Sequence, residues 1–145
     1  MFSNMGRVLA IDYGAQRVGL AMSDELGIIA SGAGTLKNDS DLLQRITTLV
    51  VEREIIRIVV GLPLTLRGEH GSSAEMVSKF VDTLRQASDR PVELIDERFT
   101  SSIAERTIRE MGVGKKKRRD KGKIDEIAAV ILLQGFLDAQ KNTAG

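Results

Sequence analysis

Three carboxylates of this chain stand where the neighbouring residues are strongly apolar. Asp12 follows the apolar run Val8–Ile11, Glu97 closes a strand-like segment, and Asp125 opens a long apolar helix. Acids that meet at one place repel each other unless a cation lies among them, and ligation by oxygen alone favours Mg²⁺ or Mn²⁺. Two such ions, about 3.5–4 Å apart, activate water and stabilise the leaving oxygen of a phosphodiester. The three acids therefore predict the catalytic metal site of a nuclease.

Each acid also has an ordinary structural explanation. Asp12 could bond its own backbone in a turn, and Glu97 could pair only with Arg98. Asp125 could be an acid favoured by the dipole in the first turn of a helix. Asp96 should point away from Glu97, because side chains alternate along a strand. The nuclease prediction therefore depends on the combination of acids rather than on any one of them.

A basic stretch directly precedes Asp125, although the formal net charge is only +1. Its members are Lys115, Lys116, Lys117, Arg118, Arg119, Lys121 and Lys123. We predict that they bind nucleic acid together with Arg17 and Arg98, since a polyanion held there would lie across the acids. A solvated loop is the alternative for the individual lysines, and Arg17 and Arg98 could instead brace the acids. Aromatic residues make up only 3% of the chain, so base stacking is not expected.

Composition narrows the class of protein further. A length of 145 residues predicts a single domain over residues 1–145. The chain has no cysteine, which excludes disulfides and cysteine-ligated zinc, and His70 is its single histidine. No apolar run reaches the ~18 residues of a membrane helix, and the N-terminus has no signal-peptide pattern. We therefore expect a cytoplasmic protein that does not associate with membranes.

The apolar patterns predict the elements that must position these residues. The predicted strands are Arg7–Ile11, Arg17–Met22, Ile28–Leu36, Ile55–Val60 and Val92–Ile95, and the predicted helices are 39 or 40 to 53, Ser72–Leu84, Ser102 to about Met111, and Ile124–Gln140. Short connections favour an antiparallel meander for the first three strands, and helical crossovers place the other two parallel to the first. The expected fold class is α/β, a mixed five-stranded sheet flanked by helices. Asp12 and Glu97 then emerge at the same edge, where ligands collect in α/β sheets.

Four motifs, in this order, resemble the YqgF/RuvX family. They are Ile11-Asp12-Tyr13-Gly14 with Arg17 and Gly19, Gly61-Leu62-Pro63-Leu64, Asp96-Glu97-Arg98-Phe99-Thr100, and Lys123-Ile124-Asp125-Glu126-Ile127-Ala128-Ala129. The resemblance spans residues 7–137. Members are described as Holliday junction resolvases and as pre-16S ribosomal RNA nucleases. The resemblance implies an RNase H-like fold whose catalytic acids are Asp12, Glu97 and Asp125.

Several functions agree with the sequence. The resemblance favours a nuclease that matures the 5′ end of pre-16S rRNA in ribosome biogenesis, and Holliday junction resolution in DNA recombination and repair is the alternative. A resolvase would be a homodimer, whereas an RNA nuclease can be a monomer. A non-catalytic RNA-binding ribosome-assembly factor is a third candidate. An ATPase of the actin or sugar-kinase type is disfavoured, since it needs a second comparable domain for which the chain leaves no room.

Overall fold

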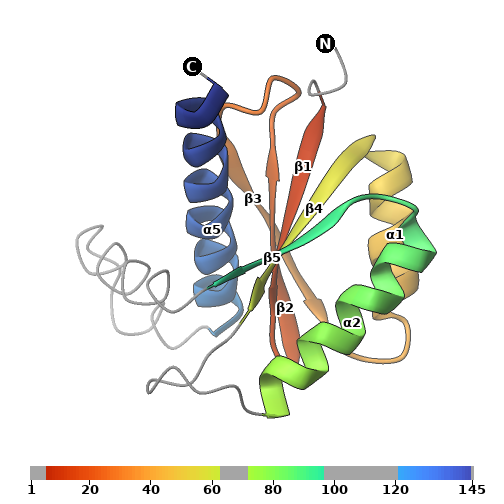
Figure 1. Ribbon diagram of the computed structural model, residues 1–145. Helices are drawn as coiled ribbons and strands as arrows, with labels where there is room; N and C mark the ends of the chain where they lie inside the picture. Colours follow the sequence, from red (N-terminus) through yellow and green to blue (C-terminus); the bar gives the residue numbers. More distant parts are fainter. Residues whose placement is uncertain (1–5, 63–71, 97–120, 145) are drawn as a thin grey trace.

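A five-stranded sheet with helices on both faces forms the centre of the protein (Figure 1). The computed structural model describes residues 6–62, 72–96 and 121–144. Its elements are β1 (Arg7–Tyr13), β2 (Arg17–Ser23), β3 (Ala30–Lys37), α1 (Leu42–Glu52), β4 (Ile55–Leu62), α2 (Ser72–Ser88), β5 (Val92–Asp96) and α5 (Lys121–Ala144). The strand order is β3-β2-β1-β4-β5.

The pairing of the strands confirms the predicted mixed sheet. β1 pairs antiparallel with β2, and β2 pairs antiparallel with β3. β4 runs parallel to β1, and β5 runs parallel to β4. Because α1 and α2 are the crossovers to β4 and β5, both cover the same face, while α5 covers the other face (Figure 1).

Alternation along each strand sends apolar side chains to two separate cores. The core on the face of α1 and α2 includes Leu9, Ile11, Val18, Leu20, Ile58 and Val60 from the strands and Ile46, Val50, Val77 and Leu84 from the helices. The core under α5 includes the small residues Ala10 and Ala21, together with Val8, Val59, Leu132 and Leu133. Small side chains on this second face allow α5 to lie close to the sheet.

The outer strand β3 differs from the predicted segment Ile28–Leu36. It starts at Ala30 because the backbone N–H groups of Ile28 and Ile29 donate to Asp24 Oδ1, at 2.7 and 2.8 Å, before the ladder begins. The register against β2 also shifts within the strand. Gly34 lies at this shift with φ +87°, a left-handed conformation that glycine adopts without steric cost.

The ends of two helices also differ from the predictions. α1 begins at Leu42 with Asp41 as its N-cap, rather than Asp39 or Ser40. The Asp39 carboxylate instead accepts the backbone N–H of Asp41 at 3.0 Å, in the turn that leads into the helix. α5 begins at Lys121 instead of Ile124, so the prediction that Lys121 and Lys123 belong to a loop is wrong.

One other predicted helix is longer than expected, and two other predicted segments lie outside the described residues. α2 begins at Ser72, as predicted, and continues past Leu84 to Ser88. The predicted helix from Ser102 to about Met111 and the loop that contains His70 lie outside the described residues.

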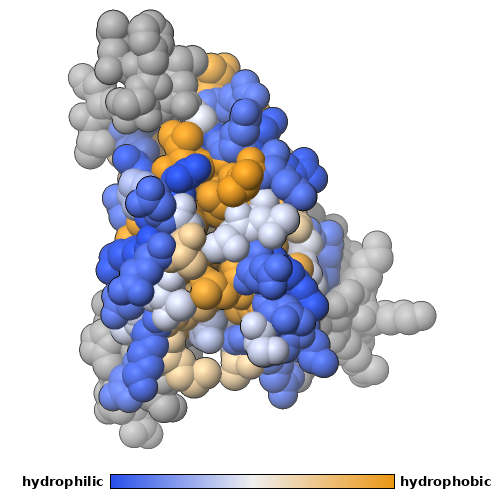
Figure 2. Space-filling model, turned by 90° about the vertical axis from the view of Figure 1, so that its right-hand side faces the viewer, coloured by the Kyte–Doolittle hydropathy of each residue, from blue (hydrophilic) through white to orange (hydrophobic). Residues whose placement is uncertain are grey.

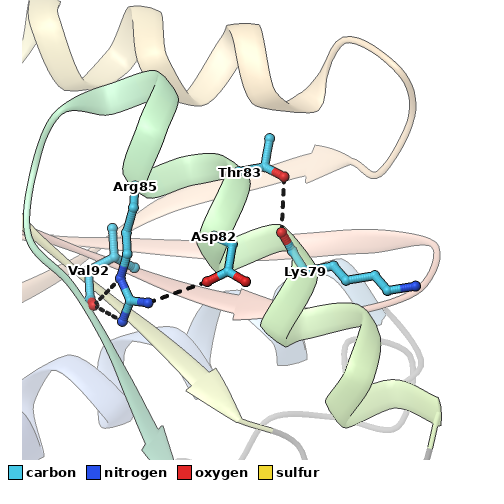
Figure 3. A network of polar contacts seen from close by, with 5 residues as sticks. All are labelled: Lys79, Asp82, Thr83, Arg85 and Val92. Atoms are coloured by element: carbon cyan, nitrogen blue, oxygen red, sulfur yellow. Dashed lines mark hydrogen bonds and ion pairs between the residues drawn. The ribbon is translucent and has the colours of Figure 1, made fainter.

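Side chains of α2 fix the start of β5 (Figure 3). Arg85 donates from Nε and Nη2 to the backbone oxygen of Val92, at 3.2 and 2.8 Å, and its Nη1 lies 3.5 Å from Asp82 Oδ1. On the same helix, the Thr83 hydroxyl donates to the backbone oxygen of Lys79 at 3.0 Å. β5 is therefore anchored at its first residue to the helix that precedes it.

The outer surface of the α1 and α2 face is mostly hydrophilic, with hydrophobic surface enclosed between hydrophilic side chains (Figure 2). None of the helices in the described ranges is long and apolar enough to cross a bilayer.

Candidate active site

Asp12 lies at the carboxyl end of β1 between two glycines. Gly19 of β2 and Gly61 of β4 stand directly opposite Asp12 in the two ladders. Val8 and Ala10 of the same strand pack under α5, so alternation puts the Asp12 side chain on this face as well. Because glycine has no side chain, neither neighbouring strand covers the carboxylate at this level.

α5 brings Asp125 to the same part of the sheet. A Cβ atom added to Gly19 would overlap the backbone oxygen of Asp125. The backbone of α5 therefore lies directly on Gly19, the residue beside Asp12 in the sheet. The two acids are more than a hundred residues apart in the chain. They nevertheless lie on the same face of the sheet, at the edge formed by the carboxyl end of β1.

Gly19 and Gly14 are thus explained by contacts within the protein. In the structure, α5 occupies the space beside Gly19, and a Cβ on Gly14 would lie 2.6 Å from the backbone oxygen of Arg17 in the tight β1–β2 turn. The close approach requires glycine at both positions.

Arg17 of β2 contacts Asp125 of α5 on the face of the sheet that α5 covers. Arg17 Nε lies 2.8 Å from Asp125 Oδ2, and the two side chains are 29% and 27% exposed. The Nε atom itself is buried and has no partner in hydrogen-bond geometry, so the contact is an ion pair without an aligned hydrogen bond. Of the two roles open to Arg17 in the sequence, this contact supports the bracing of an acid.

Asp125 does not lie in the first turn of its helix. Because α5 starts at Lys121, Asp125 is in the second turn, and the first turn carries no acid. The field of a helix end falls off within that first turn. The helix dipole therefore explains little about this acid, and its partner Arg17 explains more.

Glu126 is a structural residue of the site that the sequence reasoning missed. Its Oε2 accepts the backbone N–H of Gly34 at 2.6 Å, and its Oε1 lies 3.1 Å from Lys123 Nζ. Lys123, predicted to bind nucleic acid, is exposed on α5 and is paired in this way. The only sequence signal for Glu126 was its place next to Asp125, since its target depends on the irregularity of β3.

The remaining predicted site residues lie outside the part of the chain whose side chains the structure describes. They are Glu97, Arg98, Lys115, Lys116, Lys117, Arg118, Arg119 and Lys121, the last of which belongs to α5. The registers do show where β5 leads. Gly61 stands opposite Asp12, and the next residue, Leu62, stands opposite Asp96 at the end of β5. The chain therefore leaves β5 at the same edge of the sheet as Asp12.

The donor atoms at this edge fit a hard divalent cation. Asp12 and Asp125 supply carboxylate oxygens on one face, and Mg²⁺ and Mn²⁺ are bound through oxygen. No group of three His, Cys, Asp or Glu side chains converges within the described ranges, and the third predicted ligand, Glu97, lies outside them.

An open cavity of about 610 Å³ lies beside the ion pair, at the end of the β1–β2 hairpin. Its lining residues are Ala15, Gln16, Arg17, Thr35, Leu36, Lys37 and Asn38. Asn38 stabilises its wall by donating from Nδ2 to the backbone oxygen of Gly14 at 2.7 Å. The cavity meets the ion pair through Arg17, and neither Asp12 nor Asp125 is among its lining residues.

Solved structures of other proteins share this fold. RuvC of T. thermophilus, in complex with a Holliday junction substrate, superposes with a TM-score of 0.60 over 95% of this chain and 97% of that chain, at 14% identity. The Fowlpox virus resolvase, in complex with Holliday junction DNA, gives a TM-score of 0.53 over 92% of this chain and 98% of that chain, at 12% identity. At these identities the likeness establishes the fold alone, and it confirms the RNase H-like mixed sheet that the motifs implied.

Sequence comparison gives much closer relatives. A protein of Roseiflexus sp. (strain RS-1) is 43% identical over 143 residues, covering 97% of this chain and all of that protein. A protein of Porphyromonas gingivalis is 46% identical over 135 residues, covering 92% of this chain and 97% of that protein. Both carry the name "Putative pre-16S rRNA nuclease". The model of the RuvX family, described as Holliday junction resolvase, matches residues 6–139. With nearly its whole length matched in both comparisons, the chain belongs to the RuvX family of nucleases.

Proposed function

We propose that this protein is a divalent-metal-dependent nuclease that hydrolyses phosphodiester bonds of structured RNA and matures the 5′ end of pre-16S rRNA. The observation that carries the proposal is the placement of Asp12 and Asp125. Gly19 connects them, because it stands opposite Asp12 in the ladder and supports the backbone of Asp125. The family supplies the reaction class, and the names of the relatives supply the substrate.

In this proposal, Asp12, Asp125 and Glu97 hold Mg²⁺ or Mn²⁺ through their oxygens. Such ions, when bound, lower the pKa of water and offset the negative charge that grows on the phosphate. Asp12 is fixed by a strand in the middle of the sheet, and Asp125 is held by Arg17. During hydrolysis a water oxygen bonds to phosphorus, the ester P–O bond breaks, and the leaving oxygen takes up a proton.

The substrate is a polyanion, and the chain has cations to meet it. The basic residues 115–119 come just before α5, which begins at Lys121 and bears Asp125. We propose that these residues bind the phosphate backbone near the acids, in a single nuclease domain that works in the cytoplasm.

A second candidate function is Holliday junction resolution. The fold likeness to two proteins solved with Holliday junction DNA favours it. Two symmetric cuts need two active sites, so a resolvase should form a two-fold dimer. Paired nicks from a dimer would therefore identify this activity.

The test is cleavage by purified protein of a precursor 16S rRNA end and, in parallel, of a four-way DNA junction, each with Mg²⁺ or Mn²⁺. Metal-dependent cutting of the RNA alone is the expected result. Asp12→Asn should lower the rate at least about a hundredfold, since several kcal/mol of stabilisation by the metal depends on its ligands. Circular dichroism and RNA binding of Asp12→Asn should match wild type.

Three outcomes would contradict the proposal in different ways. Cleavage by Asp12→Asn at the wild-type rate would remove Asp12 from the site. Paired nicks in the junction, with no cut in the RNA, would establish resolution instead. If neither substrate is cut and Asp12→Asn still binds RNA as wild type does, the protein is a non-catalytic assembly factor.

A further inference from the structure

We propose that Arg17 is an internal counterion of Asp125 and that its positive charge weakens the binding of a divalent cation at the candidate active site. The proposal rests on the proposed function, because it concerns the metal site of the nuclease. It gives Arg17 a different role from the predicted binding of nucleic acid. Arg17 becomes a positioning residue that acts through Asp125.

The contact that carries the inference is short and specific. Arg17 Nε lies 2.8 Å from Asp125 Oδ2, and this nitrogen is buried although other parts of both side chains are exposed. Arg17 lies in β2, two residues before Gly19, and therefore on the same face of the sheet as the backbone of Asp125. The β1–β2 turn fixes the position of Arg17, and the packing of α5 on Gly19 fixes the position of Asp125.

A guanidinium in this place has two opposite effects on a metal ion. It orients the carboxylate, which favours binding, and it neutralises the carboxylate and repels a dication, which disfavours binding. A guanidinium is a permanent cation in proteins, so the repulsion opposes every binding event. Because Asp125 is both a proposed ligand of the dication and the partner of Arg17, the guanidinium would lie near the bound ion, and we expect the repulsion to exceed the loss of orientation.

Lys37 provides a matched control. It stands directly opposite Arg17 in the β2–β3 ladder, on the outer strand, and is exposed. Replacing Lys37 removes the same unit of charge from the same level of the sheet. It leaves the ion pair between Arg17 and Asp125 in place.

The experiment measures Mn²⁺ affinity in the absence of nucleic acid, by the electron paramagnetic resonance signal of free Mn²⁺ and by isothermal titration calorimetry. Arg17→Met should bind Mn²⁺ about tenfold more tightly than wild type, from removal of one repulsive unit charge near the ion. Arg17→Lys, which keeps the charge, should restore the wild-type Kd. Lys37→Met should leave the Kd within about twofold of wild type, because water screens an exposed charge.

A double-mutant cycle tests whether Arg17 acts through Asp125. In an Asp125→Asn background, Arg17→Met should tighten Mn²⁺ binding less than it does in wild type, because only the direct repulsion remains and no carboxylate is left to be neutralised. Thermal unfolding with and without Mn²⁺ provides a second readout. The rise in Tm caused by Mn²⁺ should be larger in Arg17→Met than in wild type, even if the metal-free variant is less stable.

The outcomes separate this inference from the proposed function. If wild type binds Mn²⁺ and Arg17→Met binds it equally or more weakly, the counterion role is overturned while the metal site stands. The same conclusion follows if Arg17→Met tightens binding as much in the Asp125→Asn background. If wild type binds no Mn²⁺ at any accessible concentration, the metal site of the proposed function and this inference both fail.

Discussion

Asp12 and Gly19 occupy opposite positions in one ladder, and each contributes differently to the candidate site. The aspartate supplies the carboxylate, and the glycine allows the backbone of Asp125 to approach the sheet. The sequence revealed the acids because a charged residue after an apolar run is conspicuous. The role of Gly19 could not be read from the sequence, because it depends on an element more than a hundred residues away.

Gly19→Ala should therefore damage the protein although it adds only one methyl group. Its Cβ would overlap the backbone oxygen of Asp125, and backbone cannot rotate aside as a flexible side chain can. We expect a loss of about 1–3 kcal/mol in the free energy of unfolding, together with loss of cleavage as α5 shifts. Chemical denaturation and the cleavage assay measure the two effects.

Gly135→Ala is the matched control for this substitution. Gly135 lies within α5, and a Cβ there would meet nothing within 4 Å. Alanine should stabilise the helix by about 0.5–1 kcal/mol and leave cleavage unchanged. If Gly19→Ala proved as stable and as active as Gly135→Ala, the close packing of α5 on β2 would be wrong.

Among the elements, β3 shows most clearly how the end of α5 is held. Its irregularity at Gly34 turns a backbone N–H toward the helix, and the Glu126 carboxylate accepts it at 2.6 Å. Glu126 is the residue next to Asp125, so the same bond fixes the second turn of α5 above the sheet. The strand and the acid are therefore positioned together.

Glu126→Ala should leave the Gly34 N–H without this acceptor in a partly buried place. The absence of such an acceptor costs about 1–3 kcal/mol in the free energy of unfolding. Amide hydrogen exchange of Gly34, followed by NMR, should become faster than in wild type. Glu126→Gln keeps an acceptor oxygen and should lose less protection; equal exchange rates in all three proteins would show that the bond is absent in solution.

The loop between β2 and β3 makes stability dependent on pH in the acid range. The N–H groups of Ile29 and then Ile28 donate to the Asp24 carboxylate and lower its pKa below the ordinary value of 3.8. A lowered pKa in the folded state means that the stabilisation is present above pH 3.8 and is lost as the pH falls through the folded pKa. An NMR titration should show Asp24 ionising below 3.8.

Asp24→Asn is the control for this titration, because it keeps an acceptor oxygen and cannot ionise. When the pH is lowered from about 5 into the acid range, the free energy of unfolding of this variant should fall less than that of wild type. A titration of Asp24 at or above 3.8 would exclude the two backbone hydrogen bonds as a stabilising feature of the charged form.

The sequence predicted the existence of these elements better than their ends. Apolar runs defined β1 and β4, the second interrupted only by Arg57, since both faces of those strands are covered by helices. The ends of α5 and β3 were misplaced for physical reasons. Lys121 to Lys123 has no apolar period although it is helical, and the start of β3 depends on the Asp24 side chain.

At the scale of the whole molecule, the order of the strands brings distant acids to one edge. β1 lies in the middle of the sheet, with β2 antiparallel on one side and β4 parallel on the other. Short turns and right-handed crossovers suffice to predict this topology from the sequence. The position of Asp125 was less predictable, because periodicity does not show which face a long final helix covers.

The basic stretch allows a test on the whole protein. Replacing Lys115, Lys116 and Lys117 by alanine should weaken RNA binding and make its salt dependence shallower, by roughly one unit of slope for each phosphate that is no longer bound. Binding isotherms at several salt concentrations measure this slope. An unchanged slope would mean that these lysines are only a solvated part of the surface.

The side chains that join α5 to β3 also limit how two copies of the protein can associate. Gln134 Oε1 accepts the N–H of Ala30 at 3.0 Å, and its Nε2 donates to the oxygen of Ile28 at 2.9 Å. With Glu126 at Gly34, these bonds use backbone groups that an outer strand would otherwise offer to a strand of another molecule. A continuous sheet through two β3 strands is therefore disfavoured, and among the described elements the helices and β5 remain open to a two-fold assembly.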